Sequence, residues 1–347
     1  MRRVLITRLT AMGDVAMTAP VVAAICQAYP DVAFDFLSTP FFSPFFEKLP
    51  NLRFIGTDIR KQKHGFLALF RLFRNLKNGK MPGAPLPNGQ TYDTVIDLHD
   101  VLRTKVLRLL FRLSGTRVYS IDKGRAQKRS LIAGKNRVQL KHMTQRYADV
   151  FRRAGFTPPP DRRVRPKEQL PAAVGYLPRQ GERWIGVSPF AQHRGKMYPT
   201  DRIARVIDAL LAHPDVRLFL FGGGEAEKRH ALELAKGRDR AHVMIGVMPL
   251  ADEMALMSNL DVMLSMDSSA MHLSSLYGVR VVSVWGQTHP YAGFLGYGQD
   301  PDDCVQRDDL DCRPCSIFGN KPCRFGDFRC FDIPPQAVAD KILNPKG

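Results

Sequence analysis

The sequence predicts an α/β protein of two domains, each built around a doubly wound parallel sheet. Short apolar runs alternate with helical patterns in both halves of the chain, as in successive βαβ units. Six prolines stand between the halves, within residues 156–182, and proline disfavours both helices and central strands. A chain of 347 residues also exceeds the usual size of a single hydrophobic core.

The first half predicts an N-terminal domain over residues 1–160. Its strands are expected at residues 3–6, 32–37, 52–55, 94–97 and 117–120. Its helices are expected at residues 14–29, 66–77, 101–113 and 142–155. Because strands and helices alternate, the sheet is expected to be parallel.

The alternation restarts after a proline-rich linker, which we place at residues 161–182. The second domain is expected over residues 183–334, with strands at 184–188, 217–221, 243–245, 262–265 and 281–284. Its helices are expected at 200–213, 225–236, 249–258 and 268–277, and residues 335–347 form a last helix expected to return toward the N-terminal domain. A ligand is expected between the two facing domains, since domain interfaces are favoured binding sites.

The excess of positive over negative charge is confined to the first half of the chain. Residues 1–170 contain 31 Lys and Arg against 12 Asp and Glu, whereas residues 171–347 contain 20 against 21. Such a field attracts nucleic acid, an anionic membrane surface or a phosphorylated substrate. No apolar run approaches the roughly 18 residues that span a bilayer, and no secretory signal is recognisable. We therefore expect a cytoplasmic protein with reduced cysteines.

Asp14 follows the first predicted strand and precedes the first predicted helix. Open α/β sheets bind ligands outside the carboxyl ends of their strands, so this carboxylate is a candidate catalytic base. Asp is also a common helix cap, and these residues alone leave both interpretations open.

Three loops after predicted strands of the second domain could bind an anionic ligand. Ser188 and Lys196 flank a loop that leads into a helix, where a hydroxyl and an ammonium group suit a phosphate. Three glycines precede Glu225, whose carboxylate could accept hydrogen bonds from ribose or sugar hydroxyls. The alternatives are a solvated loop lysine and a tight structural turn.

The third loop contains Asp267, Ser268, Ser269 and His272. These residues end a strand and open a helix, where hydroxyls and free N–H groups could hold an anion. His272 shares a helical face with Ser268, although a histidine at such a position is also an ordinary buried residue.

Two further features have competing interpretations. Cys312, Cys315, Cys323 and Cys330 could hold a structural zinc ion, but their spacing is not a standard pair of CxxC motifs, so reduced structural cysteines are favoured. The helix predicted at residues 66–77 combines apolar and basic side chains, which suits either an anionic bilayer surface or an ordinary helix with a core-facing stripe.

Taken in order, these motifs resemble glycosyltransferase family 9, the lipopolysaccharide heptosyltransferases. The resemblance rests on Gly13-Asp14 with Pro20 behind it, on Lys196-Met-Tyr-Pro199, on the glycine turn before Glu225 and on Asp267-Ser-Ser-Ala-Met-His272. The chain departs from the family in having Ser268-Ser269 where Thr-Gly is frequent, and Ser188-Pro-Phe where a Pro-Gly pair is frequent.

The resemblance implies an inverting, metal-independent sugar transfer by two facing Rossmann-like domains of the GT-B glycosyltransferase type. Asp14 would be the general base, and Lys196 would stabilise the departing diphosphate. Ser188, Glu225, Asp267, Ser268, Ser269 and His272 would bind the nucleotide-sugar donor, ADP-heptose in the best-known members. The acceptor would be an anionic, lipid-linked saccharide held by the basic domain of a monomeric enzyme, at the cytoplasmic face of the inner membrane. No cofactor and no nucleic acid are implied.

Two alternatives remain at this point. A nucleotide-sugar epimerase can use the same two-domain architecture. A non-catalytic protein that binds polyanions would need only the charge of the first half and would bind nucleic acid with a steep salt dependence.

Overall fold

The chain folds into two α/β units in a computed structural model, which describes residues 2–58, 65–81, 84–85, 90–159, 164–175, 177, 179 and 181–344. The first unit comprises Met1–Lys123 and Met143–Arg163, and the second comprises Gly124–His142 and Val164–Gly347. Parts of the expected linker, residues 161–163, 176, 178 and 180, lie outside the described residues, as do residues 345–347 of the expected C-terminal segment.

The first unit contains a five-stranded parallel sheet in the order β3-β2-β1-β6-β7. Its strands are β1 (Arg3–Thr7), β2 (Ala33–Ser38), β3 (Leu52–Gly56), β6 (Thr94–Asp97) and β7 (Arg117–Ser120). This order reverses direction between β1 and β6, so the ligand crevice of a doubly wound sheet is expected outside the carboxyl ends of these two strands.

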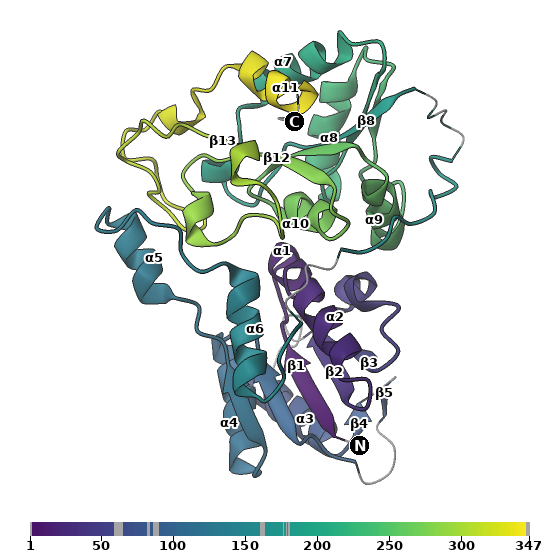
Figure 1. Ribbon diagram of the computed structural model, residues 1–347, viewed down its shortest axis with the longest axis vertical. Coiled ribbons are helices and arrows are strands. Elements are labelled where there is room, and N and C mark those ends of the chain that lie inside the picture. Colours follow the sequence, from purple (N-terminus) through teal and green to yellow (C-terminus); the bar gives the residue numbers. More distant parts are fainter. Residues whose placement is uncertain are drawn as a thin grey trace. The chain divides into compact units, whose positions relative to one another are not determined.

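Helices cover both faces of this sheet (Figure 1). They are α1 (Met12–Ala16), α2 (Ala19–Ala28), α3 (Gly65–Lys77), α4 (Leu102–Leu113) and α6 (Met143–Arg153). α3 and α4 bury Leu69, Leu76 and Leu107 against Leu5 and Val95 of the sheet. A 3-10 helix, η1 (Pro40–Phe46), and a small antiparallel pair, β4 (Lys80–Met81) with β5 (Ala84–Pro85), complete the unit.

The helix expected at residues 14–29 is divided into α1 and α2. Pro20 has no N–H to donate to the carbonyl of Ala16, and proline in a helix interior breaks the hydrogen-bond ladder. The hydroxyl of Thr18 instead donates to the carbonyl of Val15 at 2.7 Å. The first helix therefore ends within one turn of Asp14.

The second unit has a six-stranded parallel sheet in the order β10-β9-β8-β11-β12-β13, with the same reversal between β8 and β11. Its strands are β8 (Arg183–Ser188), β9 (Val216–Leu220), β10 (Ala241–Val243), β11 (Val262–Met266), β12 (Arg280–Val284) and β13 (Cys304–Val305). Its helices are α5 (Arg125–Ile132), α7 (Thr200–Leu211), α8 (Gly224–Ala235), α9 (Leu250–Ser258), α10 (Ser269–Ser275) and α11 (Pro335–Leu343), and its short 3-10 turns are η3 (Arg194–Lys196), η4 (Pro290–Ala292), η5 (Pro301–Asp303) and η6 (Arg329–Phe331).

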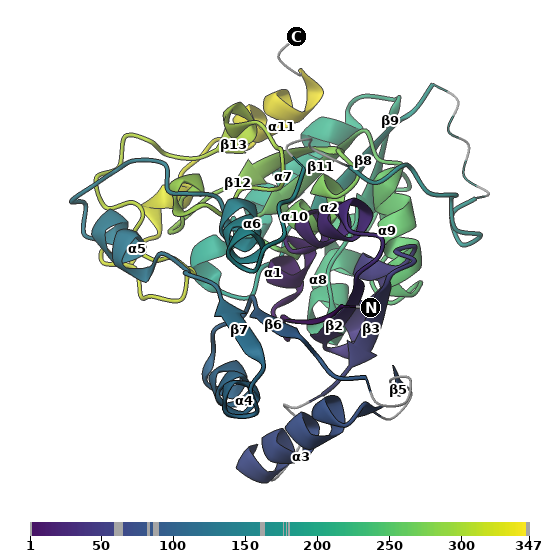
Figure 2. The same cartoon turned by 60° about the horizontal axis from the view of Figure 1, so that its bottom comes forward.

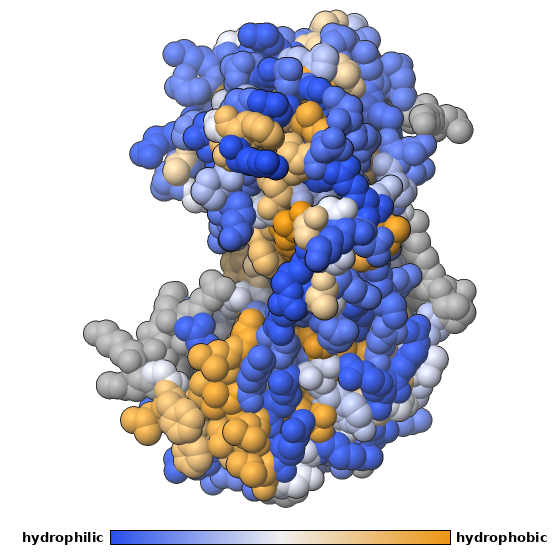
Figure 3. All heavy atoms as spheres, turned by 90° about the vertical axis from the view of Figure 1, so that its left-hand side faces the viewer, coloured by the Kyte–Doolittle hydropathy of each residue, from blue (hydrophilic) through white to orange (hydrophobic). Residues whose placement is uncertain are grey.

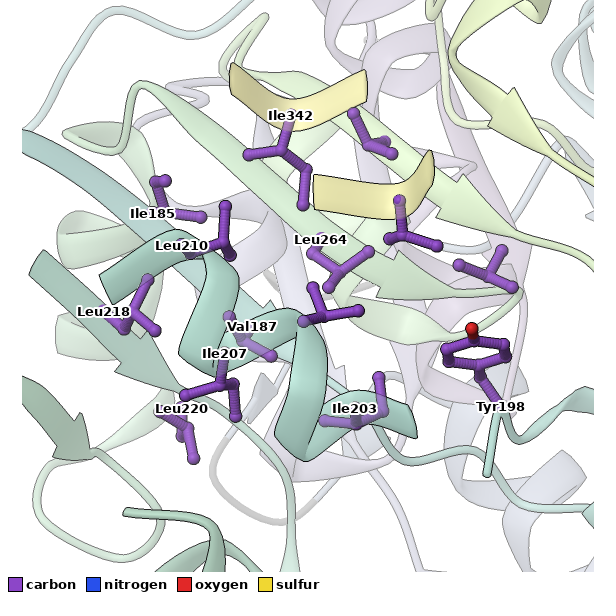
Figure 4. Close-up of a cluster of buried hydrophobic side chains, with 14 of the residues drawn as sticks. Ile185, Val187, Tyr198, Ile203, Ile207, Leu210, Leu218, Leu220, Leu264 and Ile342 are labelled. Carbon is purple, nitrogen blue, oxygen red and sulfur yellow. The ribbon is translucent and has the colours of Figure 1, made fainter. Parts of the chain in front are cut away.

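One hydrophobic core of the second unit lies between its sheet and the helices α7 and α11. Ile203 and Ile207 of α7 point toward Val187 and Leu264 of the sheet, and Ile342 of α11 covers the same cluster (Figure 4). The last helix therefore packs on α7 within its own unit. The apolar stripe of Val338, Ala339 and Ile342 explains this packing, because it completes the α7 core. The expected return of this helix toward the N-terminal domain stays a prediction.

Residues 124–142 group differently from expectation, since they belong to the second unit rather than to the first. Leu131 and Leu140 share a buried cluster with Ala292 and Ile317. The backbone N–H of Leu140 donates to the carbonyl of Tyr291 at 2.9 Å. These long-range apolar contacts decide the grouping, and no local pattern in the sequence marks them.

Candidate active site

Asp14 lies in the first turn of α1, just beyond the carboxyl end of β1. The N-cap residue of α1 is Ala11, so Asp14 does not occupy the cap position. Its carboxylate instead forms an ion pair with the guanidinium of Arg8, which is 3% exposed, while the Asp14 side chain is 31% exposed. A half-buried carboxylate with one face open to solvent is able to meet the hydroxyl group of a substrate.

Arg8 is a site residue that the sequence analysis missed. Its Nη1 atom donates to the carbonyl of Leu98 at 2.8 Å, so the guanidinium joins the ends of β1 and β6 and also holds Asp14. Burial lowers the pKa of Arg8, but Asp14 and Tyr147 outweigh this effect, and the net pKa is raised. Arg8 is therefore a fixed cation, and it orients the Asp14 carboxylate.

Asp97 organises the neighbouring strand end. This buried carboxylate accepts hydrogen bonds from the hydroxyl of Thr7 at 3.2 Å and from the backbone N–H of His99 at 2.9 Å. Arg108 of α4 lies 3.2 Å from its other oxygen. These bonds tie β1, β6 and α4 together at the edge of the sheet where Asp14 stands.

A small cavity of about 20 Å³ opens at the same edge of the first sheet. It is lined by residues that follow β1, β2, β3 and β6: Leu9, Thr10, Thr39, Thr57, Asp58, His99, Val101 and Arg103. Hydroxyl, imidazole and guanidinium groups of this kind can bind the hydroxyl and phosphate groups of a saccharide.

Lys196 and Asp267 meet at the reversal point of the second sheet. Lys196 ends η3, which follows β8, and Asp267 follows β11 directly. The Nζ atom of Lys196 lies 2.8 Å from Oδ2 of Asp267, and the two side chains are 17% and 5% exposed. Both residues were predicted from the sequence as site residues, but their pairing was not.

The other residues predicted to bind the nucleotide-sugar donor in the loops after β8 and β11 lie close in sequence to Lys196 or Asp267. Ser188 ends β8 and is buried, and Ser268 is the N-cap residue of α10 with its hydroxyl 3.1 Å from that of Ser265. Ser269 begins α10 and is half-buried, whereas His272 lies in the buried part of the same helix. Ser188 and Lys196 lie at or after the end of β8, and Asp267 follows β11. Because β8 and β11 are neighbours in the sheet, the three residues belong to the same edge.

Glu225 follows β9, the strand beside β8. It is exposed in the first turn of α8, and its neighbour Glu227 makes the local contact, accepting the backbone N–H of Gly223 at 2.7 Å. A Cβ atom on Gly222 would lie 2.9 Å from side-chain atoms of Phe190 and Ile245, so close packing favours a glycine there. Gly224 has a φ of 78°, which favours glycine, whereas a Cβ on Gly223 would meet open space. A ligand contact of Glu225 stays a prediction.

A buried arginine holds the loop behind Lys196. Arg313, which is 4% exposed, donates to the carbonyls of Trp285, Gly286 and Thr288 at 3.0, 2.5 and 2.9 Å. In the same loop, the backbone N–H of Gln287 donates to the carbonyl of Gly195 at 2.9 Å. Arg313 thus positions Lys196 indirectly, and it was not among the residues selected from the sequence.

The four late cysteines line one cavity of about 270 Å³ in the second unit, together with Arg137, Arg313, Arg324 and Arg329. All six cysteines of the chain are free thiols. Burial raises the pKa of Cys330 to about 11. Across the described residues, no group of three or more His, Cys, Asp or Glu side chains is arranged to hold a metal ion, so the zinc interpretation gains no geometric support.

None of the helices in the described part of the chain combines the length and the apolar composition that a membrane crossing requires.

The chain matches a known family over most of its length. Residues 88–316 match the profile of the family described as glycosyltransferase family 9 (heptosyltransferase). The chain belongs to this family, and it is therefore a glycosyltransferase. The epimerase and the non-catalytic polyanion-binding protein are accordingly set aside.

Curated relatives agree with this assignment. Lipopolysaccharide heptosyltransferase 1 of Pseudomonas aeruginosa is 25% identical over 364 residues, which cover 99% of this chain and 95% of that protein. Lipooligosaccharide heptosyltransferase 2 of Campylobacter jejuni is 25% identical over 180 residues, and this match spans about half of each protein, 48% of this chain and 52% of the relative.

Solved structures show the same fold. A family 9 glycosyltransferase from Veillonella parvula aligns with a TM-score of 0.72 at 19% identity and covers 99% of this chain and 96% of that chain. Escherichia coli heptosyltransferase WaaC with ADP aligns with a TM-score of 0.62 at 22% identity and covers 86% and 92%. The fold is that of the GT-B glycosyltransferases. A more distant structure, the iron-containing dodecameric glycosyltransferase TibC of E. coli, aligns with a TM-score of 0.55 at 13% identity and covers 99% and 75%.

Proposed function

We propose that this glycosyltransferase transfers heptose from ADP-heptose to a phosphorylated lipopolysaccharide core acceptor, with inversion at the anomeric carbon. Asp14 acts as the general base, and Lys196 stabilises the departing diphosphate. The observation that carries the proposal is the position of each charged group: each lies where its doubly wound sheet reverses direction, the place where such sheets bind ligands.

The reaction places opposite demands on the two groups. The acceptor hydroxyl loses its proton to the Asp14 carboxylate as it attacks, and a general base contributes about 10² to 10⁴ in rate. The bond from the anomeric carbon to the diphosphate breaks, and the leaving oxygen gains negative charge. Lys196 is held by Asp267 before the donor arrives, and a bound diphosphate then supplies a second anionic partner for its ammonium group.

The remaining residues support binding. Ser188, Ser268 and Ser269 offer hydroxyl groups to the donor, Asp267 and His272 order the loop that holds it, and Glu225 binds hydroxyls of the ribose or the sugar. The N-terminal domain, with its positive charge, binds the anionic acceptor. The enzyme acts as a monomer, without a cofactor, at the cytoplasmic face of the membrane that carries the acceptor.

The test is a transfer assay with purified protein, ADP-heptose and a heptose-free core acceptor, followed by mass spectrometry of the product. We expect product with the wild-type chain and none with Asp14→Asn, while calorimetry gives the same donor affinity for both. Calorimetry against ADP-, GDP- and UDP-sugars tests the donor. Binding of none of them, or near-full turnover by Asp14→Asn, would contradict the proposal.

A further inference from the structure

The helices α3 and α4 pack against each other and share one apolar outer surface. Of the fifteen large apolar side chains that are strongly exposed in the described chain, six lie on these two helices. They are Phe66, Leu67 and Phe70 of α3 and Leu102, Leu109 and Leu113 of α4, with exposed fractions from 47% to 78%. Figure 3 shows apolar side chains gathered on the first unit, and Figure 2 shows α3 and α4 from below. We call these six residues the α3–α4 surface.

The core does not account for this surface. Leu69, Leu72 and Leu76 already bury the inner face of α3, and Leu107 and Phe111 bury that of α4. The exposed apolar side chains are therefore additional to the core-facing stripe. From the sequence, the α3 stretch could be either an ordinary core helix or a membrane-facing one. In the structure α3 has both a buried and an exposed apolar side.

The two helices that carry the α3–α4 surface are rich in cations, and neither contains an acidic residue. α3 contains Arg71, Arg74 and Lys77, and α4 contains four further Lys or Arg residues. Within the part of the chain that the structure describes, no carboxylate pairs with Arg71, Arg74, Arg103 or Arg112. An apolar surface accompanied by such cations is complementary to a layer that has anionic groups at its surface and an apolar interior.

We propose that the α3–α4 surface docks the enzyme on an anionic phospholipid bilayer, with Phe66, Leu67 and Phe70 entering the headgroup region and the cations contacting lipid phosphates. A second copy of this chain is the less suitable occupant, because a two-fold interface would bring the same cations face to face. The inference rests on the proposed function in one respect: it supplies the contact that a lipid-linked acceptor requires.

The position of α4 connects this surface to the acceptor side of the site. Leu102 begins α4 with 78% of its side chain exposed, and the next residue, Arg103, lines the small cavity at the carboxyl edge of the first sheet. A lipid held at the α3–α4 surface would therefore have its sugar headgroup near that edge. This continuity is confined to the first unit.

The experiment is flotation of the full chain with vesicles of phosphatidylcholine containing 30% phosphatidylglycerol, and with vesicles of phosphatidylcholine alone. We expect binding to the anionic vesicles only, with affinity falling as salt rises. Phe66→Ser with Phe70→Ser should weaken binding at least tenfold. Arg71→Gln with Arg74→Gln should weaken it roughly 30-fold, since each surface cation contributes about fivefold.

Matched controls lie on the exposed helix α8 and the loop after β10 in the second unit. Leu232→Ser with Val247→Ser and Arg229→Gln with Lys236→Gln remove equally exposed groups and should leave vesicle binding unchanged. Phe70→Trp gives a direct report, because its emission should shift to shorter wavelength on anionic vesicles. This readout stands even if the serine variants fold poorly.

The inference is overturned by three results: no vesicle binding, equal binding to both vesicle types, or a dimer in solution that Phe66→Ser with Phe70→Ser dissociates. These vesicles contain no acceptor, so the result does not depend on sugar transfer. If vesicle binding fails while transfer to a delipidated acceptor proceeds, only the docking inference falls. If transfer fails while vesicle binding holds, only the proposed function falls.

Discussion

The ion pair between Lys196 and Asp267 allows the structural role of Lys196 to be separated from its role in the reaction. Lys196→Met keeps the volume of the side chain but leaves the Asp267 carboxylate, 5% exposed, without its cation. Removing one partner of a buried pair costs about 3–5 kcal/mol. At about 2–4 °C per kcal/mol, the melting temperature should fall by roughly 10 °C. Lys196→Met combined with Asp267→Asn removes both charges, and most of that loss should return.

Turnover should respond differently from stability. If Lys196 stabilises the leaving diphosphate, both the single and the double variant should lose about 10² to 10³ in kcat. The assays are calorimetric melting and ADP release under saturating donor. The exposed pair of Arg238 and Asp208, 2.7 Å apart, is the matched control, since Arg238→Met with Asp208→Asn should leave both quantities nearly unchanged. Near-normal kcat in the Lys196→Met/Asp267→Asn variant would refute the reasoning, because it would mean that Lys196 serves only to neutralise Asp267.

Three further predictions concern stability. Asp35→Ala leaves Arg3 and Arg53 without the fully buried carboxylate that pairs with both. The free energy of unfolding, measured with denaturant, should fall by about 3–5 kcal/mol, against at most about 1 kcal/mol for the exposed Asp208→Ala. Arg313→Lys cannot reach all the carbonyls that the guanidinium serves and should cost about 3 kcal/mol while weakening donor binding; unchanged melting and donor affinity would contradict this. Burial raises the pKa of Glu253 to about 7, so the folded state holds this proton more tightly than the unfolded state, and stability should fall as pH rises from about 4.5 to 7. In Glu253→Gln, melting curves recorded across this pH range should no longer show that fall in stability. An unchanged dependence of stability on pH would contradict the raised pKa of Glu253.

The alternation of strands and helices was predictable because each element has its own local spacing of apolar residues along the sequence. Both sheets have the parallel, doubly wound order that this alternation implies. The elements that were missed are short or depend on distant partners. The strand β13 has two residues and forms only by pairing with β12, and α5 carries no amphipathic pattern long enough to stand out.

The candidate site was predictable as a set of positions but not as a set of contacts. Asp14, Lys196 and Asp267 were selected because they follow strands, and strand ends are where such sheets bind ligands. The pairing of Lys196 with Asp267 depends on β8 and β11 lying side by side, which sequence order alone does not state. Arg8 was missed because it stands within an apolar run and resembles a break in the pattern. Arg8 could have been found because a cation inside an apolar strand has to be buried. A buried cation is costly unless a carboxylate lies nearby.

The position of α11 has a consequence for the order in which the chain can fold during its synthesis. Val338, Ala339 and Ile342 close the core over α7, so that core stays open to water until residue 342 has left the ribosome. Until then the apolar side of α7 is available to other nascent chains and to chaperones. Premature termination before residue 335 should therefore yield a polypeptide that aggregates, even though every candidate site residue has already been made.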